Sequence, residues 1–148
     1  METAIICGRF HGPPGSGNGG YCCGIVAGFI EGTASVRLRI PPPLDVKMDV
    51  RRQDDGVAMY HDDELVATGR PATVDIEIPE PPGFVAATKA SARYRGFESH
   101  FYPGCFVCGP QRDHGDGLRE AGDDIRENDQ RNAVANALLG DLFTHPHD

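Results

Sequence analysis

The sequence has no tryptophan, few other aromatic residues and no apolar run long enough to cross a membrane. Its uncharged stretch from Gly19 to Ile30 has twelve residues, whereas a membrane-spanning helix needs about 20. We therefore expect no membrane partner. The 148 residues are 39% hydrophobic and include 19 glycines and 12 prolines. Such a composition indicates one domain built from short strands and many turns rather than a helical bundle.

Basic residues are also scarce, with 14 against 22 acidic residues and a net charge of −8. Residues 113–148 hold nine acidic and three basic residues, a charge of −6, which leaves 13 acidic and 11 basic residues, a charge of −2, for residues 1–112. An acidic excess of this kind argues against nucleic acid as the main partner.

Two features of the sequence indicate the compartment. The first residues, Met1-Glu-Thr, lack the basic region that opens a secretory signal peptide. Five cysteines, an odd number, cannot all pair within one chain. We therefore expect a reduced, cytoplasmic protein.

The stretch Gly12–Glu31 begins as a glycine-rich turn and continues as a run without charged side chains. A helix that is apolar on every side is a buried helix, so the pattern predicts a buried helix from about Gly19 to Glu31. Gly24 and Gly28 each cost that helix about 1 kcal/mol relative to alanine, so we expect a sheet packed closely over them. Amide groups behind Asn18, at the positive end of the helix, have no side chain to block a ligand.

Six short segments have the pattern of β-strands. Apolar residues alternate with charged ones in most of them, which is typical of an antiparallel sheet with one solvated face. Hairpin signals at 54–56 and 61–63 connect three of the segments. The segments are 3–7, 35–40, 46–50, 57–60, 65–69 and 73–78. Together with the helix they predict an α+β fold, in which a sheet of five or six antiparallel strands wraps one central helix.

The remainder of the chain is less regular. Pro79–Gly83 reads as a stiff linker, and the alanine-rich stretch Phe84–Tyr94 predicts a short surface helix. We therefore divide the chain into a domain over residues 1–95, an irregular segment over 96–119 and an acidic tail over 120–148. The tail could form a last helix that Asp123 caps.

Four motifs resemble the thioesterase-like hotdog proteins of actinobacterial type. They occur in the same order as in that family, between Phe10 and Arg119, and they are FHGPPGSGNGGY (10–21), RIPPPLD (39–45), CFVCGP (105–110) and GDGLR (115–119). The resemblance implies a hotdog fold, in which a curved antiparallel sheet wraps a long helix. Many relatives carry two hotdog halves in one chain, and here only the first half is recognisable, because the 29 residues after Arg119 are too few for a second.

The resemblance also implies a binding site and candidate catalytic residues. In hotdog thioesterases, backbone amides at the start of the central helix polarise the thioester carbonyl. Gly19, Gly20 and Tyr21 would then bind the thioester of coenzyme A, with Asn18 at the position where many relatives have histidine. Asp45 is the nearest candidate for the general base. No separate cofactor is implied, because coenzyme A enters as part of the substrate.

Each of these residues also has a structural explanation. The glycines could serve only to turn the chain into the helix, and Asp45 could be an exposed turn residue. The carboxylate that many single-hotdog thioesterases carry within the helix is absent, because no acidic residue lies between Gly12 and Ile30. Cys22 has no evident activating histidine and is more typical of a small core residue.

Two peripheral features leave further alternatives. Cys105 and Cys108 with His100 and His114 could form a zinc site, although packing is the commoner role, and we expect no metal. Arg37 and Arg39 could meet coenzyme A phosphates or simply face solvent.

Two classes of function remain open. The chain is either an acyl-CoA or acyl-carrier thioesterase, a hydrolase, or a non-catalytic hotdog module that binds an acyl ligand or dimerises. In either case we expect a homodimer or a higher even oligomer, because a single hotdog sheet leaves an open edge.

Overall fold

The computed structural model describes residues 2–93, 99–113 and 116–118. The chain divides into two compact units, Met1–Ile76 and Glu77–Asp148. The first unit therefore ends within the extended segment that follows the last strand, whereas the sequence predicted a domain that runs to residue 95. The acidic tail, 120–148, with its expected cap at Asp123, lies outside the described residues.

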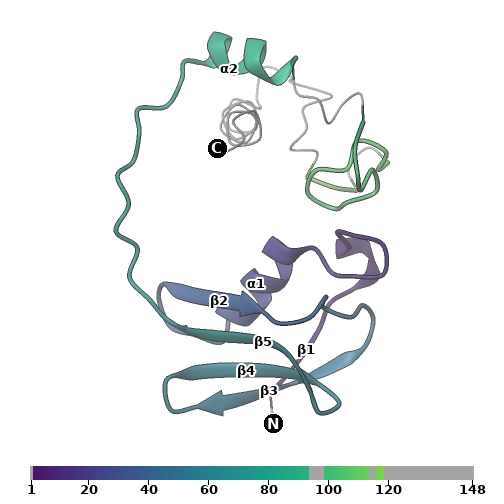
Figure 1. The fold of residues 1–148 in the computed structure, drawn as a ribbon, viewed down its shortest axis with the longest axis vertical. Helices are drawn as coiled ribbons and strands as arrows, with labels where there is room; N and C mark the ends of the chain where they lie inside the picture. The colour runs from purple at the N-terminus through teal and green to yellow at the C-terminus, as the bar shows by residue number, and fades with distance from the viewer. Residues whose placement is uncertain (1, 94–98, 114–115, 119–148) are drawn as a thin grey trace, which may run out of the picture. The chain divides into compact units, whose positions relative to one another are not determined.

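The first unit is an α+β fold built on one open sheet of five antiparallel strands (Figure 1). The order across the sheet is β1-β3-β4-β5-β2, so the strand that follows the helix lies at one edge and the first strand at the other. The strands are β1 (Glu2–Ile5), β2 (Ala34–Leu38), β3 (Lys47–Gln53), β4 (Gly56–His61) and β5 (Glu64–Pro71). Both predicted hairpins are confirmed, because β3 pairs with β4 and β4 with β5 in antiparallel register.

The alternation in the sequence correctly predicts which face of β2 and of β3 is buried. Met48 and Val50 of β3 belong to the core, and Arg51 is exposed. On β2, Val36 and Leu38 pack against the core while Arg37 is exposed. The largest fully buried side chains come from the helix, the strands and the residue after β1, and they are Ile6, Cys22, Val26, Met48, Val57, Met59 and Val66.

The central helix, α1 (Gly19–Ala27), packs against β2 and β5. Gly69 of β5 makes this packing possible, because a Cβ atom there would lie 2.8 Å from Ile30 Cδ1 and 2.9 Å from Val26 Cγ1. Real Cβ atoms do not approach that closely, so the helix reaches the sheet over a residue without a side chain.

The helix is shorter and less enclosed than the sequence predicted. It ends at Ala27, with Gly28 as its C-cap, rather than near Glu31. Gly20, Gly24 and Gly28 are exposed, and a Cβ at Gly24 would meet nothing within 4 Å among the described residues. The expectation of a sheet over these glycines was therefore wrong. A helix face made of glycines carries no charge, but it has no apolar side chains to bury either. The absence of charged residues in the sequence does not distinguish such a face from an apolar one.

Arg52 of β3 connects strand β1 to the turn that follows α1. Its guanidinium donates to both carboxylate oxygens of Glu2, at 2.7 and 2.8 Å, and to the carbonyl of Phe29, at 2.7 Å. The hydrogen bond from Arg52 lowers the pKa of the Glu2 carboxyl. Strands β1 and β3 are thereby tied to the turn that follows α1.

The predicted sixth strand, 73–78, is not part of the sheet. Its residues are extended and pair with no strand among the described residues. The alternating apolar side chains Val74, Ile76 and Ile78 are 65%, 71% and 83% exposed. The prediction failed because alternation determines only which side chains share a face, whereas a strand also needs a neighbour to pair with.

The second unit contains α2 (Phe84–Ser91), which confirms the predicted short surface helix with Phe84 and Val85 exposed.

Arg112 joins residues in or next to the CFVCGP and GDGLR motifs. Its guanidinium donates to the carbonyl of Gly104 at 2.8 Å and to the carboxylate of Asp116 at 2.8 Å, and lies over the ring of Phe106. No described helix is long and apolar enough to cross a membrane.

Candidate functional site at the N-terminus of α1

A small hairpin leads into α1. His11 and Gly17 form a β-bridge, the amide of Gly12 donates to the carbonyl of Ser16 at 2.9 Å, and the amide of Asn18 donates to the carbonyl of Phe10 at 2.8 Å. At its tip, Gly15 has a φ of +73°, a conformation that glycine adopts without strain. The glycine-rich motif is thus a closed hairpin that fixes where the helix begins.

Asn18 is the N-cap of α1. Its Oδ1 accepts a hydrogen bond from the amide of Tyr21 at 3.0 Å. The amides of Gly19 and Gly20 have no acceptor within the part of the chain that the structure describes. Gly19 is half-buried and Gly20 is exposed. Two adjacent amides at the positive end of the helix dipole are therefore available to an oxygen atom from outside.

The surroundings of these amides are mainly apolar. The rings of Phe10 and Tyr21 stack with their centroids 4.0 Å apart and 13° between their planes. Leu38 of β2 lies beside Gly19, because a Cβ there would be 3.6 Å from Leu38 Cδ1. On the inner side, the Cys22 thiol packs under Gly17, where a Cβ would lie only 2.6 Å from its Sγ.

Asp45 is an exposed turn residue, as its structural explanation from the sequence expected. Its φ of +58° places it in the left-handed region, which aspartate tolerates better than most residues. Its Oδ1 accepts a hydrogen bond from the amide of Gly8 at 2.8 Å. The same turn contacts the hairpin, because the carbonyl of Pro42 accepts from the amide of Gly17 at 2.8 Å. Asp45 thus joins the end of β1 to the turn before β3.

The thiol of Cys22 is not a nucleophile at neutral pH. Burial raises its pKa to about 11, and the neighbouring Cys23 thiol adds to this shift. Burial also raises the pKa of Cys23. A protonated thiol lacks the reactivity of a thiolate, and Cys22 belongs to the hydrophobic core.

Comparison with family models, with curated proteins and with solved structures gives no match. The candidate site therefore rests on the geometry of this chain.

The structure brings together most of the predicted binding residues. The amides of Gly19 and Gly20 lie side by side, but the amide of Tyr21 is already bonded to Asn18. Phe10 was not predicted as a site residue. The sequence does show an aromatic residue at each end of the glycine-rich stretch, and this could have suggested Phe10. Only the hairpin in the structure brings the rings of Phe10 and Tyr21 together.

No group of three metal-ligating side chains occurs among the described residues, and His114, the fourth residue considered for zinc, lies outside them. The Nδ1 of His100 instead accepts from the amide of Tyr102 at 3.0 Å.

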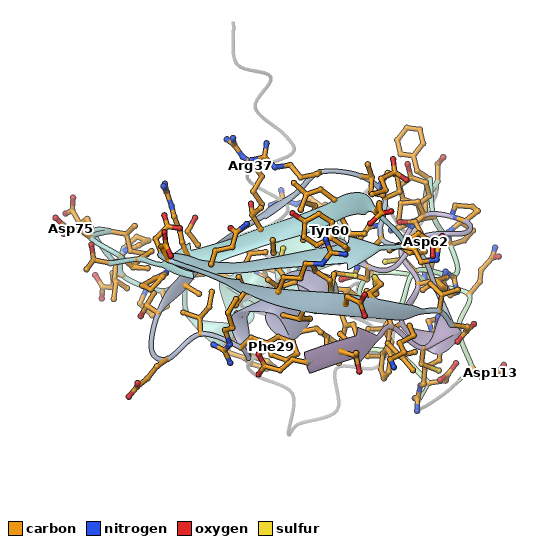
Figure 2. All side chains as sticks on the ribbon, turned by 90° about the horizontal axis from the view of Figure 1, so that it is seen from below. Phe29, Arg37, Tyr60, Asp62, Asp75 and Asp113 are labelled. Atoms are coloured by element: carbon orange, nitrogen blue, oxygen red, sulfur yellow. The ribbon has the colours of Figure 1, made fainter. Side chains whose placement is uncertain are left out.

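The outer face of the sheet carries a polar groove of about 310 Å³ next to β2. Three arginines line it together with uncharged polar residues and one acid, and the full set is Ser35, Arg37, Arg39, Gln53, Asp55, Thr68, Gly69 and Arg70. Arg37 and Tyr60 lie on the face of the sheet opposite Phe29 (Figure 2). The groove and the helix N-terminus are therefore on different faces.

Proposed function

We propose that this chain is a single hotdog unit that binds an acyl thioester, of coenzyme A or of a carrier protein, at the N-terminus of α1. The observation that carries the proposal is the pair of Gly19 and Gly20 amides, which have no acceptor among the described residues and follow a hydrogen-bonded hairpin. A helix wrapped by one antiparallel sheet is the arrangement that the sequence resemblance implies.

The chemistry follows from the two amides. A thioester carbonyl oxygen accepts hydrogen bonds from both, and the helix dipole favours the partial negative charge on that oxygen. The acyl group then extends along the apolar side chain of Leu38, which lies beside Gly19. Glycine at both positions leaves room for the ligand to approach the backbone closely.

Binding is better supported than hydrolysis. A hydrolase needs a group that activates water, and the carboxylate of Asp45 already accepts the amide of Gly8, while the Cys22 thiol stays protonated. Asn18 acts as a helix cap. A non-catalytic acyl-ligand module is therefore the favoured form of the proposal, and a slow thioesterase that uses Asp45 is the second.

Calorimetric titration with acyl-CoA of increasing chain length tests the proposal. We expect saturable binding that Gly19→Val abolishes, because the side chain crowds both amides. The fold should survive, because the Cβ makes only an ordinary 3.6 Å contact. Gly24→Val is the matched control, because it places the same side chain on the same helix in open space.

Two results would refute this assignment. Either Gly19→Val binds as well as the native chain, or neither acyl-CoA nor an acyl-carrier thioester binds at all. Hydrolysis should be followed by chromatography of the products, because thiol reagents would also react with the exposed Cys7.

A further inference from the structure

Two parts of the chain lack a strand partner on at least one side among the described residues. One is β2, which lies at the edge of the sheet and pairs only with β5 among the described strands. The other is the extended segment 73–78, which follows β5 and pairs with none of them. An exposed edge and an exposed apolar strand are both sites where further strands add.

The two have complementary side-chain patterns. In β2 and its continuation, Val36, Leu38 and Ile40 pack on the core, while Arg37 and Arg39 are exposed on the outer face. The segment 73–78 repeats this alternation with the opposite charge, and its residues are Thr73, Val74, Asp75, Ile76, Glu77 and Ile78. Pairing would place its apolar residues beside the inner face and its acids beside the arginines.

The charged residues of β2 and of the segment 73–78 form no ion pairs among the described residues. Arg37 and Arg39 form no ion pair with the described residues, and neither do Asp75 and Glu77. Asp75 lies beyond the end of the sheet, away from Arg37 (Figure 2). The other sheet edge is less suitable, because β1 (Glu-Thr-Ala-Ile) carries an acid and no base.

The segment cannot reach the outer edge of its own β2. The amide of Ala72 still donates to the carbonyl of Thr33, immediately before β2. The outer edge lies two strand spacings from β5, about 10 Å. Only Thr73 separates Ala72 from Val74, and one residue spans about 3.4 Å. Residues 73–78 could therefore pair with this edge only from another molecule.

We propose that residues 73–78 of a second copy of this chain add as a strand to the outer edge of β2. Backbone hydrogen bonds extend the sheet, the isoleucines and valine of the segment cover the exposed side of the inner face, and Asp75 and Glu77 pair with Arg37 and Arg39. The proposal does not depend on the ligand at α1, so it stands or falls separately from the proposed function.

Sedimentation of the full chain tests it by charge reversal. We expect the native chain to form dimers or larger assemblies that dissociate as salt is raised. Asp75→Lys/Glu77→Lys should dissociate them, and so should Arg37→Glu/Arg39→Glu. An equimolar mixture of these two variants should associate again. Glu31→Lys/Glu64→Lys is the matched control, because it changes the same charge at exposed positions elsewhere.

A proline substitution tests the backbone pairing itself. Ile76→Pro removes an amide from a segment that is outside the sheet, so the fold should be unchanged by circular dichroism while association is lost. Glu80→Pro, in the neighbouring proline-rich linker, should associate normally. A monomeric native chain would overturn the proposal, and so would association that survives Ile76→Pro or both charge reversals.

Discussion

The side-chain oxygen of Asn18 accepts the amide of Tyr21 at 3.0 Å, so this asparagine caps the central helix. The cap satisfies one of the four amides that a helix start leaves unpaired. The cap also determines which amides are left without an acceptor. The amide of Tyr21 is bonded to Asn18, whereas the amides of Gly19 and Gly20 have no acceptor among the described residues. A residue that resemblance suggested as catalytic thus has a definite structural role next to the binding amides.

Asn18→Ala should lower the free energy of unfolding by about 1 kcal/mol, the usual cost of a lost N-cap. Asn18→Ser, which keeps a capping oxygen, should be nearly neutral. Chemical denaturation of the three proteins measures this difference. If Asn18→Ala were as stable as the native chain, the cap seen in the structure would not stabilise the helix.

Substitutions at Asp45 separate its structural role from a role as a base. Asp45→Asn keeps an oxygen for the amide of Gly8 and tolerates the positive φ, so stability and thioester binding should be retained. Asp45→Ala removes the hydrogen-bond acceptor and tolerates the positive φ less well. It should therefore lower the free energy of unfolding by about 1–3 kcal/mol. Should the native chain hydrolyse acyl-CoA and Asp45→Asn not, Asp45 would be the base after all.

Gly69→Ala tests the close approach of helix and sheet. The new methyl group would lie 2.8 Å from Ile30 Cδ1 and 2.9 Å from Val26 Cγ1, and overpacking of this kind costs about 1–3 kcal/mol. Gly24→Ala, whose methyl group points into open space, should be neutral or slightly stabilising. Denaturation midpoints of the two variants give the comparison, and equal midpoints would contradict the packing described above.

The buried Cys22 thiol predicts a loss of stability at high pH. Its pKa rises from 9.0 to about 11 on folding, so between these values the unfolded chain has lost a proton that the folded chain retains. Stability is therefore full below pH 9 and falls as the pH rises toward 11, by about 2 kcal/mol for a shift of this size. Stability of the native chain and of Cys22→Ala should be compared across this range. The expected result is a shallower decline in the variant, and parallel curves would count against the raised pKa.

Much of the first unit was predictable because its determinants are local. The alternation around Met48 and Val50 shows which side of β3 is buried, and Asp54-Asp55-Gly56 turns the chain directly into the paired strand β4. The start of α1 was predictable for the same reason, since Asn18 and the glycines after it are adjacent in sequence. Antiparallel neighbours joined by short turns require little information from the rest of the chain.

Tertiary structure decided the features that depend on contacts between distant residues. Residues 73–78 alternate as clearly as β3 does, but none of the described strands pairs with them. Gly24 and Gly69 are equally plain in the sequence, yet one faces open space and the other allows the helix to reach the sheet. Periodicity and composition describe what a segment can bury or turn. Whether a segment finds a packing or pairing partner depends on the path of the whole chain, because side-chain packing and strand pairing join residues that are distant in the sequence.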